Sequence, residues 1–372
     1  YDVTAGEDSS LMAANITNTR KMQVRTPDVV VQVVPSQAEL IEVQVIDGRR
    51  CLIVPLEGDV EVNVGEDVQS TGGTTIYGDV YGGSAQGYVN AYLATSTTGE
   101  TTTTTLTYST DKTTTVNLNR GIIYGDAYGG GLGQKKGFNG ATEDIAAEVG
   151  GNVSVNVKGV AFNISNYTDE GHTDVVKTGR VFGCNNLYGS PKGNVTVTVS
   201  KTVGLKDDGT INSTKPTRES GSYEIAAVYG GGNLANYTAT GKKASVIIQG
   251  CALTSIKEVY GGGNAAAVPE SDVEIYSAYE IGSVFGGGNG KDDYKSDSGW
   301  QNNDGANVNG QTNTIIYGGT VHEAYGGSNE KGMITGTVYI DIASTNPDNC
   351  TLDVAKIVSS THYQRQKALT RC

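Results

Sequence analysis

The sequence predicts an all-β protein in which short repeats stack as a β-solenoid and share one apolar core. Three observations lead to this prediction. An aromatic residue followed by glycines recurs along the chain, as in "VYGGGN" at Val228 and Val259 and "VFGGGN" at Val284. Short runs of alternating apolar and polar residues lie beside most of these corners. A unit as short as the stretch from Val259 to Val284 cannot bury its own apolar face, so neighbouring units must stack.

The glycine corners define the repeat. Glycine allows positive φ and close backbone approach, so a glycine run after a β-branched and an aromatic residue indicates a sharp turn rather than a helix. We expect positive φ at these corners, for example at Gly261. Seven corners align on their aromatic residues: Tyr81, Tyr128, Tyr188, Tyr229, Tyr260, Phe285 and Tyr325. The four later corners also share an asparagine after the glycines.

Alternating runs predict the strands. The runs "NVSVNV" at Asn152, "NVTVTV" at Asn194 and "TVYIDI" at Thr337 place apolar side chains at every second position, as in a strand with one buried face. The valines of the later corners are expected to point into one core between parallel strands. Two long polar stretches, residues 95–115 and 290–311, predict insertions outside the stack.

The two ends of the chain differ from the repeats. An open end of stacked strands must be covered, and residues 1–57, which lack the repeat, predict an N-terminal β cap or small β-domain. The repeats with their polar insertions are expected at residues 58–345. Residues 346–372 are expected to form a C-terminal cap or tail, and the spaced apolar residues of 351–369 predict a short helix there.

The composition argues against several classes of partner and site. A formal net charge of −13 argues against a nucleic-acid partner, because phosphate binding requires clustered lysine and arginine. No stretch approaches eighteen apolar residues, so no transmembrane segment is expected. The five cysteines have no metal-binding spacing, which argues against a zinc site. A disulfide between Cys350 and Cys372 is one pairing that the sequence allows.

The corners resemble those of right-handed parallel β-helix proteins of bacterial cell surfaces, especially long, adhesin-like proteins rich in glycine and asparagine with "VFGGGN"-like units. The resemblance covers residues 58–344 and implies a right-handed parallel β-helix in which identical side chains form ladders. It implies an aromatic column of the corner residues. It also implies a buried ladder of four asparagines: Asn233, Asn264, Asn289 and Asn329. The first three repeats lack this asparagine, so the ladder is expected to stop before them.

The aromatic column is a candidate binding surface. Rings exposed at the strand spacing of about 4.8 Å could hold sugar rings, although packing is the favoured role of such stacks. The candidate rings are Tyr81, Tyr128, Tyr229, Tyr260, Phe285 and Tyr325. The asparagine ladder is expected to be structural, because buried amides satisfy backbone groups at the corners.

Asp79 and Asp126 occupy the same place in "YGDVYGG" and "YGDAYGG", so they are expected to lie near each other. Paired carboxylates can bind calcium or act as acid and base, as in β-helix enzymes that cut acidic polysaccharides. The later corners do not keep this aspartate, and no histidine or arginine repeats alongside it. A solvated acidic corner is therefore favoured, no residue is assigned a catalytic role, and calcium is the only cofactor considered.

The leading hypothesis is a non-enzymatic, extracellular or cell-surface β-helix that presents loops to a glycan or protein, or that assembles with its own kind. The alternative is a carbohydrate-active β-helix enzyme, a polysaccharide lyase or glycoside hydrolase. An enzyme requires an acid, a base and an electrophile that converge within hydrogen-bond reach, whereas a stalk requires only uniform ladders.

Overall fold

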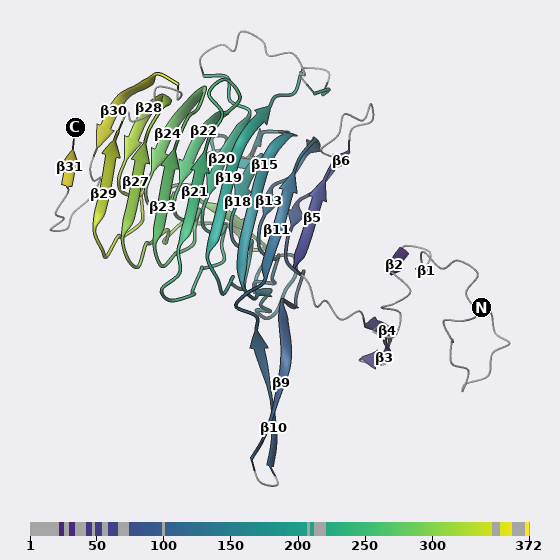
Figure 1. Ribbon diagram of the computed structural model, residues 1–372. Helices are drawn as coiled ribbons and strands as arrows, with labels where there is room; N and C mark the ends of the chain where they lie inside the picture. The colour runs from purple at the N-terminus through teal and green to yellow at the C-terminus, as the bar shows by residue number, and fades with distance from the viewer. Residues whose placement is uncertain are drawn as a thin grey trace. The chain divides into compact units, whose positions relative to one another are not determined.

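The computed structural model describes residues 22–25, 30–33, 42–46, 49–53, 59–65, 74–98, 101–206, 209–211, 221–343, 350–358 and 369–371. Every regular element in these ranges is a β-strand, so the predicted all-β class is confirmed (Figure 1). The described residues contain no helix with the length and apolar character needed to cross a membrane. The chain divides into two compact units, Tyr1–Glu57 and Gly58–Cys372.

The described residues of the first unit form two antiparallel strand pairs. Strand β1 (Met22–Arg25) pairs with β2 (Val30–Val33), and β3 (Glu42–Ile46) pairs with β4 (Arg49–Ile53). The apolar runs of residues 1–57 thus form strands where the structure describes them.

Two parallel sheets make up most of the second unit (Figure 1). The eleven-stranded sheet contains β31 (Leu369–Arg371), β29 (Val338–Ile342), β27 (Thr312–Ile316), β23 (Ser271–Ile275), β21 (Ala244–Ile248), β19 (Val195–Val203), β15 (Asn152–Phe162), β11 (Thr113–Leu118) and β5 (Val60–Val64) in spatial order, with β12 (Gly121–Ile123) pairing β15 and β6 (Thr75–Ile76). The eight-stranded sheet contains β30 (Leu352–Val358), β28 (Gly319–Tyr325), β24 (Glu280–Phe285), β22 (Ser255–Tyr260), β20 (Ile225–Tyr229), β18 (Arg180–Phe182), β13 (Ala127–Tyr128) and β7 (Val80–Tyr81). Each repeat supplies strands to both sheets, because the long strands alternate between them along the chain.

The core lies between the two sheets. Val228, Val259 and Val284 lie opposite one another in parallel strands of the eight-stranded sheet, and all three are fully buried. Val246 and Val273 of the eleven-stranded sheet belong to the same apolar cluster. The alternation seen in the sequence therefore matches the side chains that point between the sheets.

The third corner differs from its predicted alignment. Phe182, and not Tyr188, lies opposite both Tyr128 and Tyr229 in the parallel ladder, and Tyr188 is 40% exposed. The corner is "VFGCNN" at residues 181–186, in which Cys184 and a following asparagine replace two glycines. Because of these replacements, the sequence pattern did not identify this corner. The later "LYG" at residues 187–189 resembled the other repeats more closely and was aligned instead.

The C-terminal helix prediction is wrong where the structure describes this segment. Residues 352–358 form strand β30, which pairs in parallel with β28 and places Val354 opposite Val321. Leu352 and Val354 alternate with exposed Asp353, a period of two that suits a strand. The remainder of the predicted helix, residues 359–368, lies outside the described residues.

In the described part of the repeats, three antiparallel strand pairs are inserted. They are β9 (Ala91–Thr98) with β10 (Thr101–Tyr108), β16 (Ser165–Asn166) with β17 (Val176–Thr178), and β25 (Tyr294–Ser296) with β26 (Gly299–Gln301). Most of the threonine-rich stretch lies in β9 and β10, which extend away from the two sheets in Figure 1, but residues 113–115 begin β11 of the eleven-stranded sheet. The predicted insertion at 290–311 likewise ends inside the stack, because Val308 is fully buried in the core and bridges Val268 and Ile334. A short parallel pair, β8 (Tyr88–Val89) with β14 (Glu148–Val149), lies between corners of neighbouring repeats.

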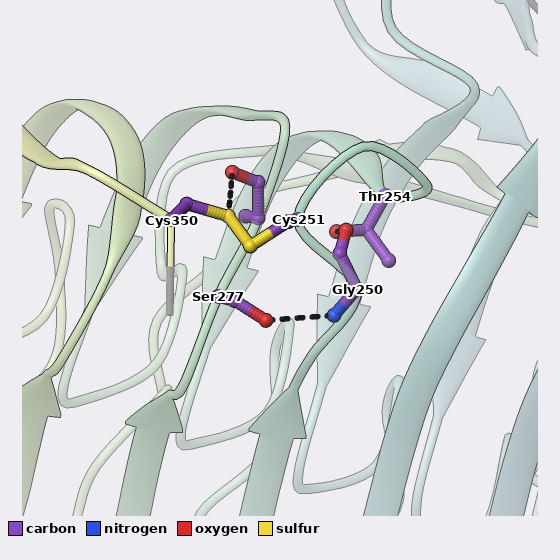
Figure 2. Close-up of a disulfide and its surroundings, with 6 residues drawn as sticks. Gly250, Cys251, Thr254, Ser277 and Cys350 are labelled. Atoms are coloured by element: carbon purple, nitrogen blue, oxygen red, sulfur yellow. Dashed lines mark hydrogen bonds between the residues drawn. A yellow bond between two sulfur atoms is a disulfide. The ribbon is translucent and has the colours of Figure 1, made fainter. Parts of the chain in front are cut away.

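A disulfide joins turns that are distant in sequence (Figure 2). Cys350 pairs with Cys251 rather than with Cys372, across 99 residues of sequence. Cys251 follows β21, and Cys350 precedes β30. The Cys350 Sγ also lies 3.7 Å from the carbonyl oxygen of Ala278, in the turn between β23 and β24. Close by, the Gly250 amide donates to Ser277 Oγ (Figure 2). The disulfide therefore ties the last described strand of the eight-stranded sheet to an earlier repeat.

Candidate functional site

The corner aromatics form one continuous stack on the eight-stranded sheet. Neighbouring ring centroids are 4.6 to 5.0 Å apart, and each pair is within 9° of parallel. The stack contains Tyr81, Tyr128, Phe182, Tyr229, Tyr260, Phe285 and Tyr325. This spacing follows from parallel strands in register.

The inner rings cannot serve as the predicted sugar platform. Tyr128, Tyr229 and Tyr260 are at most 1% exposed and Phe285 is 5% exposed, and each has a ring against both faces. Burial raises the pKa of the three tyrosines well above its ordinary value. A sugar could stack on them only if the repeats separated. Tyr81 and Tyr325 are the partly exposed ends of the stack.

The asparagines form a hydrogen-bonded ladder beside the rings. Asn264, Asn289 and Asn329 each donate from Nδ2 to the Oδ1 of the preceding asparagine, at 2.9 to 3.0 Å. The ladder does not stop at Asn233, because Asn233 donates to Asn186 Oδ1 at 2.9 Å. Asn186 in turn donates to the Tyr81 hydroxyl. The extension was missed because the third corner was aligned on the wrong aromatic residue.

A column of charged residues lies two positions before the rings in the early repeats. The Arg180 guanidinium donates to Asp126 Oδ2 from Nη2 at 2.7 Å and from Nε at 3.1 Å, and its backbone amide donates to Asp126 Oδ1. Asp79 accepts from the Asp126 amide at 2.8 Å and from the Tyr81 hydroxyl at 2.9 Å. The predicted proximity of Asp79 and Asp126 is therefore present, but the sequence interpretation missed the arginine.

This arrangement favours a structural ion pair over a calcium site. Asp126 is 3% exposed, and burial raises the pKa of its carboxyl although Arg180 opposes that shift. Burial alone would lower the pKa of Arg180, but the charge of Asp126 raises it overall. Calcium takes six to eight oxygen ligands, whereas a guanidinium already occupies this corner. No group of three or more histidine, cysteine or acidic residues suited to a metal occurs among the described residues.

Three inserted segments, residues 135–145, 163–178 and 290–303, come together although they belong to different repeats. The Phe138 ring stacks on Tyr294 at 6.0 Å, and the Gly140 amide donates to Asp297 Oδ2 at 2.8 Å. These contacts join the first segment to the third.

Trp300 joins the second segment to the third. The His172 ring stacks face to face on it at 3.8 Å, and Tyr167 meets it edge-on at 4.8 Å. Asp169 Oδ2 accepts from the Trp300 Nε1 at 3.0 Å and from the Lys295 Nζ at 2.7 Å. The three segments are therefore held by specific contacts rather than by chance proximity.

A cavity of about 320 Å³ lies between the inserted segments and the eight-stranded sheet. The sheet contributes Asp79, Asp126, Tyr128 and Arg180. The ladder contributes Asn186, Asn233 and Asn264. The inserted segments contribute Phe138, Tyr167, Lys177, Asp292, Asp293, Tyr294 and Lys295, among others. Rings, amides and charges thus face one small space, as is typical of a ligand site.

The sequence predicted only part of the cavity lining. Asn233, Asn264 and the two aspartates were singled out as repeat positions, whereas Asn186 and Arg180 were missed with the third corner. Tyr167, Lys177 and Tyr294 belong to insertions without a repeat signal. The aromatic residues of these otherwise polar insertions were the available clue, because exposed loops rarely need Trp300 or Phe138 for packing.

Residues 1–64 match the model of a family described as Domain of unknown function (DUF4317). The match covers the first unit and β5, and leaves the later repeats and the cavity outside it. Neither the curated proteins nor the solved structures gave a significant match. The function therefore has to be inferred from the geometry of the repeats and the cavity.

Proposed function

We propose that residues 58–345 form a right-handed parallel β-helix in an extracellular, adhesin-like surface protein that binds a glycan without cleaving it. Strands that alternate between two parallel sheets support the β-helix, and parallel crossovers are overwhelmingly right-handed. Ladders of identical side chains support the resemblance to glycine- and asparagine-rich surface proteins.

The cavity is the observation that carries the binding function. Three insertions from separate repeats converge through the Trp300 and Phe138 contacts, and they enclose rings and amides together. Rings can pack on the apolar faces of sugars, while amides and carboxylates can bond hydroxyl groups. A uniform stalk does not require such a space.

The disulfide supports an extracellular location. Disulfides form and persist in oxidising compartments such as the cell exterior, and are rare in reducing cytosol. The bond between Cys251 and Cys350 closes a long loop and is built into the turns of the repeats. Export would provide the conditions for it to form.

A polysaccharide lyase or glycoside hydrolase is the second candidate, because Asp292 and Asp293 line the cavity and carboxylates can act as acid and base. We rank it lower because Asp126, the carboxylate most deeply placed at the sheet, is already held by Arg180.

A glycan array run beside a polysaccharide-degradation assay tests the proposal. We expect binding to at least one glycan, loss of about tenfold or more of that affinity in the double variant Phe138→Ala with Tyr294→Ala, and no release of reducing ends. The matched control is Tyr276→Ala with Tyr317→Ala, which removes a stacked pair outside the cavity and should leave binding unchanged. Cleavage that Asp292→Asn or Asp293→Asn abolishes would replace the proposal with the enzyme.

A further inference from the structure

Two of the three cations that line the cavity are paired with carboxylates. Arg180 holds Asp126 at 2.7 Å, and Lys295 holds Asp169 at 2.7 Å. Each pair cancels its own charge, so neither cation offers a full positive charge to a ligand. The third cation, Lys177, lies 5.9 Å from the centroid of the Tyr167 ring.

Three other carboxylates at the cavity, Asp79, Asp292 and Asp293, have no lysine or arginine partner among the described residues. Asp79 accepts from a backbone amide and a tyrosine hydroxyl, and Asp292 accepts from Asn289 Nδ2 at 3.0 Å. Asp293 Oδ1 accepts from the backbone amide of Asn303, and Asp293 Oδ2 lies 3.7 Å from His172 Nε2. The cavity therefore keeps three carboxylates without a lysine or arginine partner, against one cation, Lys177, for which the described residues show no ion pair.

The aromatic rings suit a cation that also carries apolar CH groups. Phe138, Tyr167 and Tyr294 come from all three inserted segments and line the cavity together. The negative face of such rings attracts ammonium groups, and the attraction strengthens when the cation is shielded from water. The neighbouring asparagine amides have two donors and two acceptor lone pairs each, more than the ladder uses.

The cavity is small enough to select a chain end or a short saccharide. Its volume of about 320 Å³ lies at the lower limit of ligand sites, which span about 300–1,000 Å³. Binding to the interior of a long polysaccharide chain would require a longer groove.

From this charge balance, and resting on the glycan-binding function proposed above, we propose that the cavity takes a saccharide bearing a free amino group and rejects uronic acids. The ammonium group lies against the carboxylates of Asp292 and Asp293 and the rings, while hydroxyl groups bond the asparagine amides. A carboxylate on the sugar would face like charges, and this repulsion costs affinity.

Titration calorimetry with three sugars of one ring type tests this directly. Glucosamine, glucose and glucuronic acid differ in charge but share their hydroxyl arrangement on most of the ring. At a pH where the amine is protonated, we expect glucosamine to bind about tenfold or more tightly than glucose, and glucuronic acid to bind weakest. The double variant Asp292→Asn with Asp293→Asn should remove this preference, whereas Asp353→Asn on β30, outside the cavity, should keep it.

The outcomes separate the inference from the function on which it rests. Equal affinity for glucosamine and glucose, or tighter binding of glucuronic acid, overturns the inference while glycan binding stands. Binding to no sugar and to no array glycan overturns the proposed function itself. A charge preference that survives in the double variant, with its fold verified by melting, also overturns the inference.

Discussion

The repeats from Ile225 to Asn329 and those from Val80 to Phe182 share one backbone plan but differ in what their corners carry. In the later region, glycine-rich corners with asparagine repeat without interruption, so rings and amides form regular ladders. In the early region, the column before the rings carries the Asp79, Asp126 and Arg180 cluster. Two of the three inserted segments, residues 135–145 and 163–178, lie within this region. The comparison indicates that uniform repeats stabilise the stack, while departures from uniformity create the cavity.

Removing Arg180 should have the largest effect on the early region. Arg180→Met leaves Asp126 buried without its partner, and breaking one side of a buried pair costs about 3–5 kcal/mol. Urea unfolding of the purified variant measures this loss. Lys356→Met at the far end of the same column is the control, because its exposed pair with Glu323 should leave stability nearly unchanged. Equal losses in both variants would contradict the difference between the regions.

Removing the disulfide should come next. Cys251→Ala with Cys350→Ala releases the tie across the later repeats, and the loss of a disulfide that closes a long loop is expected to cost about 2–4 kcal/mol. A reductant should lower the melting temperature of the wild type by a similar amount and leave the variant unaffected. A wild type insensitive to the reductant would argue against the pairing.

The glycine corners should be sensitive to a single methyl group. Gly261 is not among the residues with positive φ, so the expected reason for this glycine was wrong. A Cβ there would lie 2.4 Å from the carbonyl oxygen of Gly286 in the next repeat. Gly261→Ala should therefore cost about 1–3 kcal/mol by overpacking. Gly305→Ala, where a Cβ meets nothing within 4 Å, is the control, and an equal melting temperature for both variants would contradict the close approach.

Removing one hydroxyl should have the smallest effect. Tyr260→Phe keeps the ring stack, since Phe182 and Phe285 already occupy the same column. It removes the hydrogen bonds of the Tyr260 hydroxyl with Asn289 at 3.1 Å and Asn329 at 3.3 Å, for a loss of about 0.5–1.5 kcal/mol. Calorimetric melting resolves such a change. A loss as large as that of Arg180→Met would show that the ladder depends on the hydroxyl.

Periodicity was enough to predict the strands, their parallel stacking and the four later asparagines, because a fixed repeat brings equivalent residues into register. It was insufficient where the repeat is disguised, as at Phe182, whose corner lacks two glycines. The ion pair of Arg180 with Asp126 depends on that register, so the wrong alignment could not predict it. The cavity could not be predicted, because contacts such as His172 with Trp300 join insertions whose sequences carry no common pattern.

Hydrogen–deuterium exchange with and without saturating glucosamine tests most directly whether the inserted segments form the site. We predict slower exchange in residues 135–145, 163–178 and 290–303, and unchanged exchange in strands β27 and β29, which lie outside the cavity. Protection confined to other parts of the chain, or no change in any segment, would contradict the account.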